Sequence, residues 1–227
     1  MSFYIMKLDS IKNEIPEKLF EILEKEGISE LRPAQEKAIH AGLLKDKNLL
    51  VCTPTASGKT LIAELAALKA ILEGKGKAIY IVPLKALASE KFKDFKRKYG
   101  HLIKVALSIG DIDSADSYLM DYDLILTTSE KLDSLLRHHA PWIMNIKVII
   151  VDEVHLLDDQ SRGPTLEILL TMLRQILKNV QIIALSATIG NPKELAEWLS
   201  AALVEDSWRP VKLLKGVYFD GKIEFTE

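Results

Sequence analysis

The sequence contains one cysteine, Cys52, and only 7% aromatic residues. A single thiol cannot form an intramolecular disulfide and is typical of a reducing compartment, so we expect a cytoplasmic protein. The longest apolar stretch, residues 61–72, is interrupted by Glu64 and Lys69, and it is too short and too charged to cross a bilayer. The amino terminus lacks the apolar core of a signal peptide. We therefore expect no membrane partner.

Charge of one sign is also lacking, because 30 Lys and Arg face 32 Asp and Glu, which gives a formal net charge of −2. This balance excludes a uniformly basic nucleic-acid coat but leaves room for a local basic face. With 227 residues, of which 48% are hydrophobic, the chain has enough material for an independent core. The same fractions exclude a disordered or collagen-like protein.

Short apolar runs alternate with longer stretches of helical period from about residue 48 onward. The predicted strands are 48–53, 78–82, 104–108, 124–128, 148–151 and 181–185. The predicted helices between them are 59–72, 86–99, 129–137, 164–177 and 192–199. Because the strand candidates are apolar throughout, they suit strands covered on both faces. The alternation therefore predicts an α/β fold with a doubly wound parallel sheet.

The two ends of the chain differ from this alternating unit. Helices are predicted at 17–25 and 33–41, so residues 1–45 form a short helical lead-in. After Ala202 the periodicity fades, and residues 208–219 read as extended chain because Pro210 and Gly216 discourage a helix. The last residues, up to Glu227, suggest a cut inside a longer protein.

The first predicted strand runs directly into Thr53-Pro54-Thr55-Ala56-Ser57-Gly58-Lys59-Thr60, after which we expect a strongly amphipathic helix. A Gly-Lys-Thr sequence at a strand-to-helix turn is typical of a phosphate-binding loop, whose backbone N–H groups surround a polyphosphate. Lys59 would neutralise phosphate charge and the Thr60 hydroxyl would bind Mg²⁺. Thr53 replaces the first glycine of the simple motif. The alternative is a tight turn capped by Ser57.

Two adjacent acids, Asp152 and Glu153, follow the strand predicted at 148–151. Carboxylates directly after four apolar residues are costly unless a cation meets them, and Mg²⁺ carried by ATP is such a cation. Asp152 would hold the metal, and Glu153 would orient and deprotonate the attacking water. The alternative is an exposed helix cap, since acids favour the first turn of a helix.

Five segments together resemble motifs I, Ia, Ib, II and III of the superfamily 2 helicases, in that order. They are Thr55-Ala56-Ser57-Gly58-Lys59-Thr60, Pro83-Leu84-Lys85-Ala86-Leu87, Thr128-Ser129-Glu130-Lys131, Asp152-Glu153-Val154-His155 and Ser186-Ala187-Thr188. The run from His155 through Arg162-Gly163-Pro164 is similar to the DExH subgroup of Ski-like helicases. The stretches 27–35, 130–138 and 208–211 favour the branch of archaeal Holliday-junction-migration DNA repair helicases.

The resemblance implies a RecA-like fold and a role for each matching residue. It implies that residues 1–206 form the first motor domain and that 207–227 begin the linker to a second motor lobe in the same full-length chain. Gln35 would read adenine, since one carboxamide offers both a donor and an acceptor. The remaining ATP-binding residues would be Thr55, Ala56, Ser57, Gly58, Lys59 and Thr60. His155, Ser186 and Thr188 would couple ATP hydrolysis to domain movement.

The same resemblance implies contacts with the nucleic-acid backbone. Lys85, Thr128 and Lys131 have suitable chemistry, a cation or a hydroxyl near a helix amino terminus. Either lysine could equally be solvated surface. Arg137, His138 and His139 follow on the same predicted helix and would extend the track.

The implied function is that of an ATP-dependent DNA helicase, with ATP and Mg²⁺ as cofactors and single-stranded or forked DNA as partner. It would move 3′ to 5′ at stalled or branched forks during repair. Three alternatives stay open: a Ski-type RNA helicase, a phosphate-loop GTPase or small-molecule kinase, and a non-catalytic nucleic-acid-binding module with a relic nucleotide fold. The GTPase lacks support because no Asn-Lys-x-Asp sequence occurs.

Overall fold

The computed structural model describes residues 6–110, 116–211 and 214–226. Residues 1–5 of the predicted lead-in, and 212–213 and 227 of the predicted linker, lie outside the described residues. The helices are α1 (Glu17–Lys25), α2 (Pro33–His40), α3 (Lys59–Leu72), α4 (Lys85–Tyr99), α5 (Ser129–Arg137), α6 (Gly163–Ile176) and α7 (Pro192–Leu199). Short 3-10 helices lie at Leu8–Ile11, Leu43–Lys45, Ser117–Asp121, Pro141–Asn145 and Val154–Asp158.

Seven strands form one sheet, in the order β3-β4-β2-β5-β6-β1-β7, and every described pairing in it is parallel. The strands are β1 (Leu49–Cys52), β2 (Lys77–Ile81), β3 (Val105–Ser108), β4 (Leu124–Thr127), β5 (Ile146–Val151), β6 (Gln181–Ser186) and β7 (Ala202–Glu205). The predicted parallel α/β sheet is confirmed. The edge strand β7 was not predicted.

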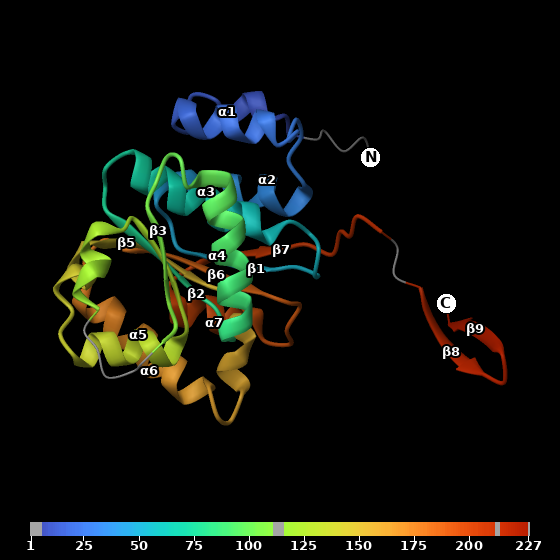
Figure 1. The fold of residues 1–227 in the computed structure, drawn as a ribbon. Helices are drawn as coiled ribbons and strands as arrows, with labels where there is room; N and C mark the ends of the chain where they lie inside the picture. The colour runs from blue at the N-terminus through green and yellow to red at the C-terminus, as the bar shows by residue number, and fades with distance from the viewer. Residues whose placement is uncertain (1–5, 111–115, 212–213, 227) are drawn as a thin grey trace.

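Helices cover both faces of this sheet. The chain crosses from β1 towards β3 in one direction and later from β4 to β7 in the other. Right-handed crossovers that run in opposite directions put their helices on opposite faces. Accordingly α1, α2, α3 and α4 contribute to one hydrophobic cluster, and α5, α6 and α7 contribute to the other (Figure 1). The sheet is doubly wound, as the sequence predicts.

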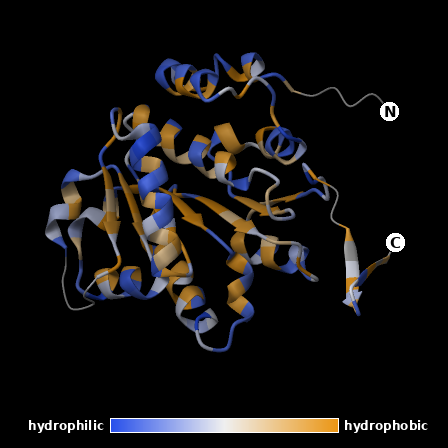
Figure 2. Cartoon of the chain, turned by 45° about the vertical axis from the view of Figure 1, so that its right-hand side comes forward, coloured by the Kyte–Doolittle hydropathy of each residue, from blue (hydrophilic) through white to orange (hydrophobic). Residues whose placement is uncertain are grey.

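The strands supply both clusters because successive side chains point to opposite faces of a sheet. In β1, Leu49 and Val51 pack into the first cluster, whereas Leu50 and Cys52 pack into the second. All four residues are buried, which explains why this strand is continuously apolar. Figure 2 shows largely hydrophobic strands between helices that mix hydrophobic and hydrophilic residues.

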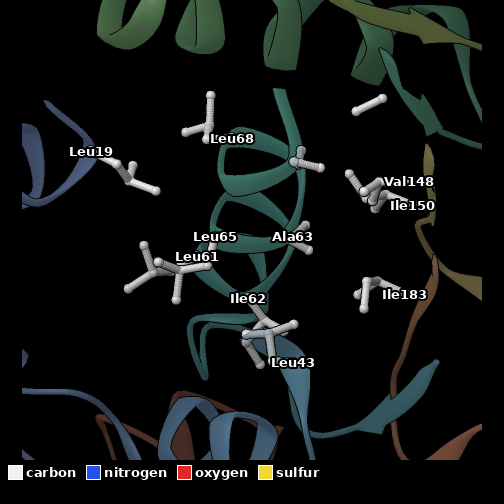
Figure 3. Packing of buried hydrophobic residues seen from close by; sticks show 14 of the residues in the cluster. Leu19, Leu43, Leu61, Ile62, Ala63, Leu65, Leu68, Val148, Ile150 and Ile183 are labelled. Carbon is white, nitrogen blue, oxygen red and sulfur yellow. The ribbon is translucent and has the colours of Figure 1, made fainter. Parts of the chain in front are cut away.

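The helix after the predicted phosphate loop, α3, is buried on most of its circumference. Figure 3 shows Ala63 facing the sheet residues Val148 and Ile150, while Leu61 and Leu65 face the lead-in. The lead-in side chains Leu19 and Phe20 of α1 belong to the same hydrophobic cluster. The prediction of a strongly amphipathic helix is therefore wrong for α3, because the lead-in covers the side that would otherwise meet water.

Beyond the sheet, β8 (Lys215–Phe219) and β9 (Lys222–Thr226) form an antiparallel hairpin that stands apart from the body (Figure 1). Extended chain was predicted for 208–219, and β8 matches the second half of that stretch. In the described part of the chain, no helix is long and apolar enough to cross a membrane.

Candidate nucleotide-binding site

The predicted phosphate loop connects β1 to α3 and is closed by its own side chains. The hydroxyl of Thr53 lies 2.7 Å from that of Ser57, and this contact is buried. Ala56 and Gly58 have positive φ values of 64° and 94°. The chain therefore curls back before it enters α3. Thr53, which replaces the first glycine of the simple motif, thus connects the start of the loop to Ser57 through this hydrogen bond.

Helix α2 holds this loop from outside. The Gln35 Nε2 donates to the carbonyl of Gly58 at 3.0 Å, and Arg32 Nη1 donates to the carbonyl of Ala56 at 2.7 Å. Gln35 Oε1 in turn accepts from the backbone N–H of Arg32 at 2.8 Å. A Cβ on residue 58 would lie 2.4 Å from Gln35 Nε2, so only glycine fits here without displacement. We call these contacts the α2 clamp.

Lys59, the first residue of α3, turns its ammonium back over the loop. Its Nζ donates to the carbonyls of Thr53 at 2.8 Å and Ser186 at 3.0 Å, so it joins the ends of β1 and β6. Burial lowers the pKa of Lys59, and the negative charges of Glu153 and Asp152 oppose this shift. The ammonium of Lys59 donates to neutral carbonyl oxygens in this structure. A hydrogen bond from the same ammonium to an anionic oxygen, such as that of a phosphate, would be stronger.

The acid pair lies at the end of β5. Asp152 Oδ2 accepts from the hydroxyl of Tyr80 at 3.2 Å and lies 3.2 Å from the ammonium of Lys91. Its other oxygen accepts from the backbone N–H of Glu153 at 3.1 Å. Glu153 has a left-handed φ of 52° and its Oε2 lies 3.3 Å from Nδ1 of His155. Burial, followed by the charge of Asp152, raises the pKa of Tyr80 well above its usual range, so its hydroxyl stays a donor.

The loop and the acid pair open into one pocket of about 420 Å³ at the carboxyl ends of the strands. Ten residues line it, namely Arg32, Thr55, Ala56, Gly58, Lys59, Thr60, Lys91, Asp152, Glu153 and Pro210. Thr60 and Asp152 offer oxygen donors, which suit Mg²⁺. Within the described ranges, no group of three or more His, Cys, Asp or Glu residues is placed to hold a metal. A divalent ion here would therefore take its other ligands from phosphate and water.

The predicted nucleic-acid residues divide into one exposed side chain and two buried ones. Lys85 is exposed at the first residue of α4. Thr128 is buried, and its hydroxyl caps α5 by accepting from the N–H of Lys131. Lys131 is only 3% exposed, and its ammonium lies 3.0 Å from Asp116. Both side chains are buried in this structure, and their predicted contacts with a nucleic-acid backbone stay predictions. In the proposed extension of the track, Arg137 pairs with Asp133 at 2.7 Å.

Of the predicted coupling residues, Ser186 and His155 contact lining residues of this pocket, namely Lys59 and Glu153. Ser186 is fully buried at the end of β6, and its hydroxyl has no hydrogen-bond partner among the described residues. Thr188 is exposed two residues later.

Sequence reasoning missed three residues of the pocket region. Arg32 precedes Pro33, so the sequence places it at the start of a helix. The sequence does not show that its side chain contacts the phosphate loop. Lys91 lies within a strongly basic helix, so nothing in the sequence separates it from its solvated neighbours. Tyr80 left a usable signal, because a tyrosine inside an apolar strand needs a partner for its hydroxyl.

A parallel doubly wound sheet with a lysine-bearing loop and an acid pair at one edge defines the RecA-like class of α/β folds. A sequence profile of the DEAD/DEAH box helicases matches residues 32–195. The chain belongs to the DEAD/DEAH box helicase family. The predicted kinship with archaeal superfamily 2 helicases is confirmed by the relatives described next.

Two similar proteins are named ATP-dependent DNA helicase Hel308. The one from Pyrococcus horikoshii is 54% identical over 216 residues, which cover 95% of this chain and 30% of that protein. The one from Methanocaldococcus jannaschii is 57% identical over 216 residues, which cover 92% of this chain and 18% of that protein. The chain thus spans less than a third of the length of these relatives.

A solved structure is also similar, the crystal structure of the DUF1998 helicase MrfA bound to DNA. Its TM-score is 0.73 at 30% identity, over 86% of this chain and 30% of that one. The structure of MrfA with DNA and AMPPNP gives a TM-score of 0.72 at 30% identity, over 86% of this chain and 29% of that one.

Proposed function

We propose that this chain is the first ATP-binding motor domain of an ATP-dependent DNA helicase. Residues 1–206 form that domain, and 207–227 begin the connection to a second motor lobe. The observation that carries the proposal is the convergence of Lys59, Thr60 and Asp152 on one pocket. The Hel308 relatives, named as ATP-dependent DNA helicases, favour DNA work over the other phosphate-loop activities.

In the proposed reaction the chain's own groups bind the triphosphate and the water. The loop N–H groups surround the phosphates, and Lys59 exchanges its two carbonyl partners for phosphate oxygens. Thr60 and Asp152 would hold Mg²⁺, which when bound neutralises phosphate charge. Glu153 orients the attacking water and accepts its proton at a carboxylate oxygen.

Gln35 is proposed to read adenine with the part of its carboxamide that the α2 clamp leaves free. A carboxamide carries two N–H groups and two acceptor lone pairs, and the contacts with Arg32 and Gly58 use one of each. Ser186, Thr188 and His155 are proposed to couple hydrolysis to movement of the second lobe. Ser186 already contacts the site, because its carbonyl accepts from Lys59.

Lys85 is proposed as a contact to the DNA backbone, at the exposed start of α4. Binding through a few cations should weaken steeply with salt. The whole protein would translocate 3′ to 5′ and unwind stalled or forked DNA during repair. Its second lobe would supply the arginine that typically contributes about 10³–10⁵ in rate. The isolated chain should therefore hydrolyse ATP slowly and unwind nothing.

The proposal is tested by the binding of a fluorescent N-methylanthraniloyl ATP analogue with Mg²⁺ to the 227-residue chain. Lys59→Ala should abolish binding with an unchanged circular dichroism spectrum, since this lysine adds little to the core. Lys45→Ala, at an exposed position of a 3-10 helix, is the matched control and should bind normally. Retained affinity in Lys59→Ala would contradict the site.

The choice between DNA and RNA needs a separate measurement. Single-stranded DNA and RNA of equal sequence should compete for the chain, and DNA should win at moderate salt. Preference for RNA would favour the Ski-type RNA helicase instead. Duplex unwinding by the chain alone would contradict the need for a second lobe.

A further inference from the structure

The carboxylate of Asp152 already holds a cation in this structure. Lys91 Nζ lies 3.2 Å from Asp152 Oδ2, and the two side chains are 21% and 12% exposed. Lys91 comes from the middle of α4, outside the segments that resemble helicase motifs. Among the described residues, no other lysine or arginine forms an ion pair with Asp152.

The phosphate-loop lysine does not provide this charge compensation. Lys59 Nζ is hydrogen bonded to two backbone carbonyls, those of Thr53 and Ser186. Glu153 has a different neighbour, His155. Removing a carboxylate from water without a counter-ion is costly, and the ion pair with Lys91 offsets part of this cost at Asp152.

Tyr80 fixes the position of the Lys91 ammonium. The ammonium lies 5.1 Å from the centre of the Tyr80 ring, and the Tyr80 hydroxyl donates to the same Oδ2 atom at 3.2 Å. Tyr80 is fully buried in β2. The Tyr80 ring and the Asp152 carboxylate thus form a binding site for one cation at the edge of the pocket.

This cation site includes the carboxylate of Asp152, which is proposed above to bind Mg²⁺. An ammonium on Oδ2 and a divalent ion on the same carboxylate repel each other at short range. Asp152 therefore binds Mg²⁺ more weakly while Lys91 is paired with it, and pairs with Lys91 more weakly while Mg²⁺ is bound. We propose that Lys91 is the counter-ion of Asp152 in the nucleotide-free protein and competes with Mg²⁺ for that carboxylate. This inference rests on the proposed function, which assigns the metal to Asp152.

The ion pair of Lys91 is one of several contacts that hold α4. The carboxyl-terminal end of the same helix is fixed to α3, because Lys98 Nζ lies 3.3 Å from Glu64 Oε1 and the Tyr99 hydroxyl donates to Glu64 Oε2 at 2.9 Å. Glu64 is buried, and Lys91 also acts on it electrostatically. Metal loading would therefore remove one polar contact of α4, while the buried Ala88 and Phe95 keep the helix packed on the sheet.

The test is the Mg²⁺ dependence of binding of the same fluorescent ATP analogue. Lys91→Met keeps the stem over Tyr80 and removes the charge, so the Mg²⁺ concentration at half-saturation should fall about two- to fivefold, the ratio expected for a partly exposed ion pair. Lys91→Arg keeps the charge and should behave as wild type. Lys93→Met, at an exposed position of α4, is the matched control and should show no change.

An unchanged or higher half-saturating Mg²⁺ concentration in Lys91→Met, with a native circular dichroism spectrum, overturns the inference. Lys91→Gln repeats the measurement should the methionine variant fail to fold. The two proposals fail differently. Wild-type chain that binds no analogue at any Mg²⁺ concentration refutes the ATP site itself, whereas normal binding with an unaltered Mg²⁺ dependence refutes only the role of Lys91.

Discussion

Replacing Gly58 with alanine tests the α2 clamp on the phosphate loop. Gly58 has a φ of +94°, and a Cβ there would lie 2.4 Å from Gln35 Nε2 and 3.0 Å from Arg32 Cδ. The left-handed backbone costs an alanine about 1–2 kcal/mol. Displacing Gln35 removes its hydrogen bond to Gly58, worth about 0.5–1.5 kcal/mol. We expect a loss of about 1.5–3.5 kcal/mol in the free energy of unfolding.

Gly74 provides the matched control, just beyond the other end of α3. It also has a positive φ, +70°, but no atom lies within 4 Å of its added Cβ. Gly74→Ala should therefore show the backbone cost alone, about 1–2 kcal/mol. The difference between the two variants isolates the contacts with Gln35 and Arg32.

Urea unfolding followed by circular dichroism measures both losses. Gly58→Ala should also weaken binding of the fluorescent ATP analogue at least about tenfold, the ratio that 1.4 kcal/mol represents. Gly74→Ala should leave this affinity unchanged. Equal losses of stability in the two variants, or full affinity in Gly58→Ala, would refute the clamp.

Two further predictions concern other buried polar groups. Gln35→Ala should relax the preference for ATP over GTP, measured by displacement of the fluorescent analogue with each nucleotide, and an unchanged preference would remove Gln35 from the base site. Burial raises the pKa of Glu64 above its ordinary value of 4.5, although Lys98 and Tyr99 oppose the shift. The folded protein then binds more protons than the unfolded chain above pH 4.5, so the wild type should lose stability relative to Glu64→Gln as the pH rises from there. Urea unfolding at a series of pH values checks this, and parallel curves for the two proteins would contradict it.

Most of the sheet could be predicted from the sequence because its inner strands are buried on both faces. Continuous apolar runs mark such strands. Strand β5 begins two residues before its predicted range, and β6 ends one residue after its predicted range. The edge strand β7 escaped, since Val204 alone among its four residues is buried. An edge strand with mixed exposure has neither the continuous nor the alternating pattern.

The residues of the candidate site could be predicted only where charged or polar side chains come directly after a predicted strand. Lys59 and Asp152 stand at such ends, and the parallel sheet brings them to one edge. The burial of Lys131 could not be predicted, because the sequence does not show that Asp116 reaches it inside the protein. Lys91 was missed for the same reason, as its value depends on a tertiary contact with Asp152.

The carboxamide of Gln35 joins the backbone of Arg32 to that of Gly58, and so connects the proposed base end of the pocket with its phosphate end. Binding free energies at two connected ends are reciprocal. If Gln35 couples the two ends, the factor by which the terminal phosphate changes the preference for adenine over guanine equals the factor by which the base changes the affinity for that phosphate. Selectivity measured with a diphosphate would then differ from selectivity measured with a triphosphate.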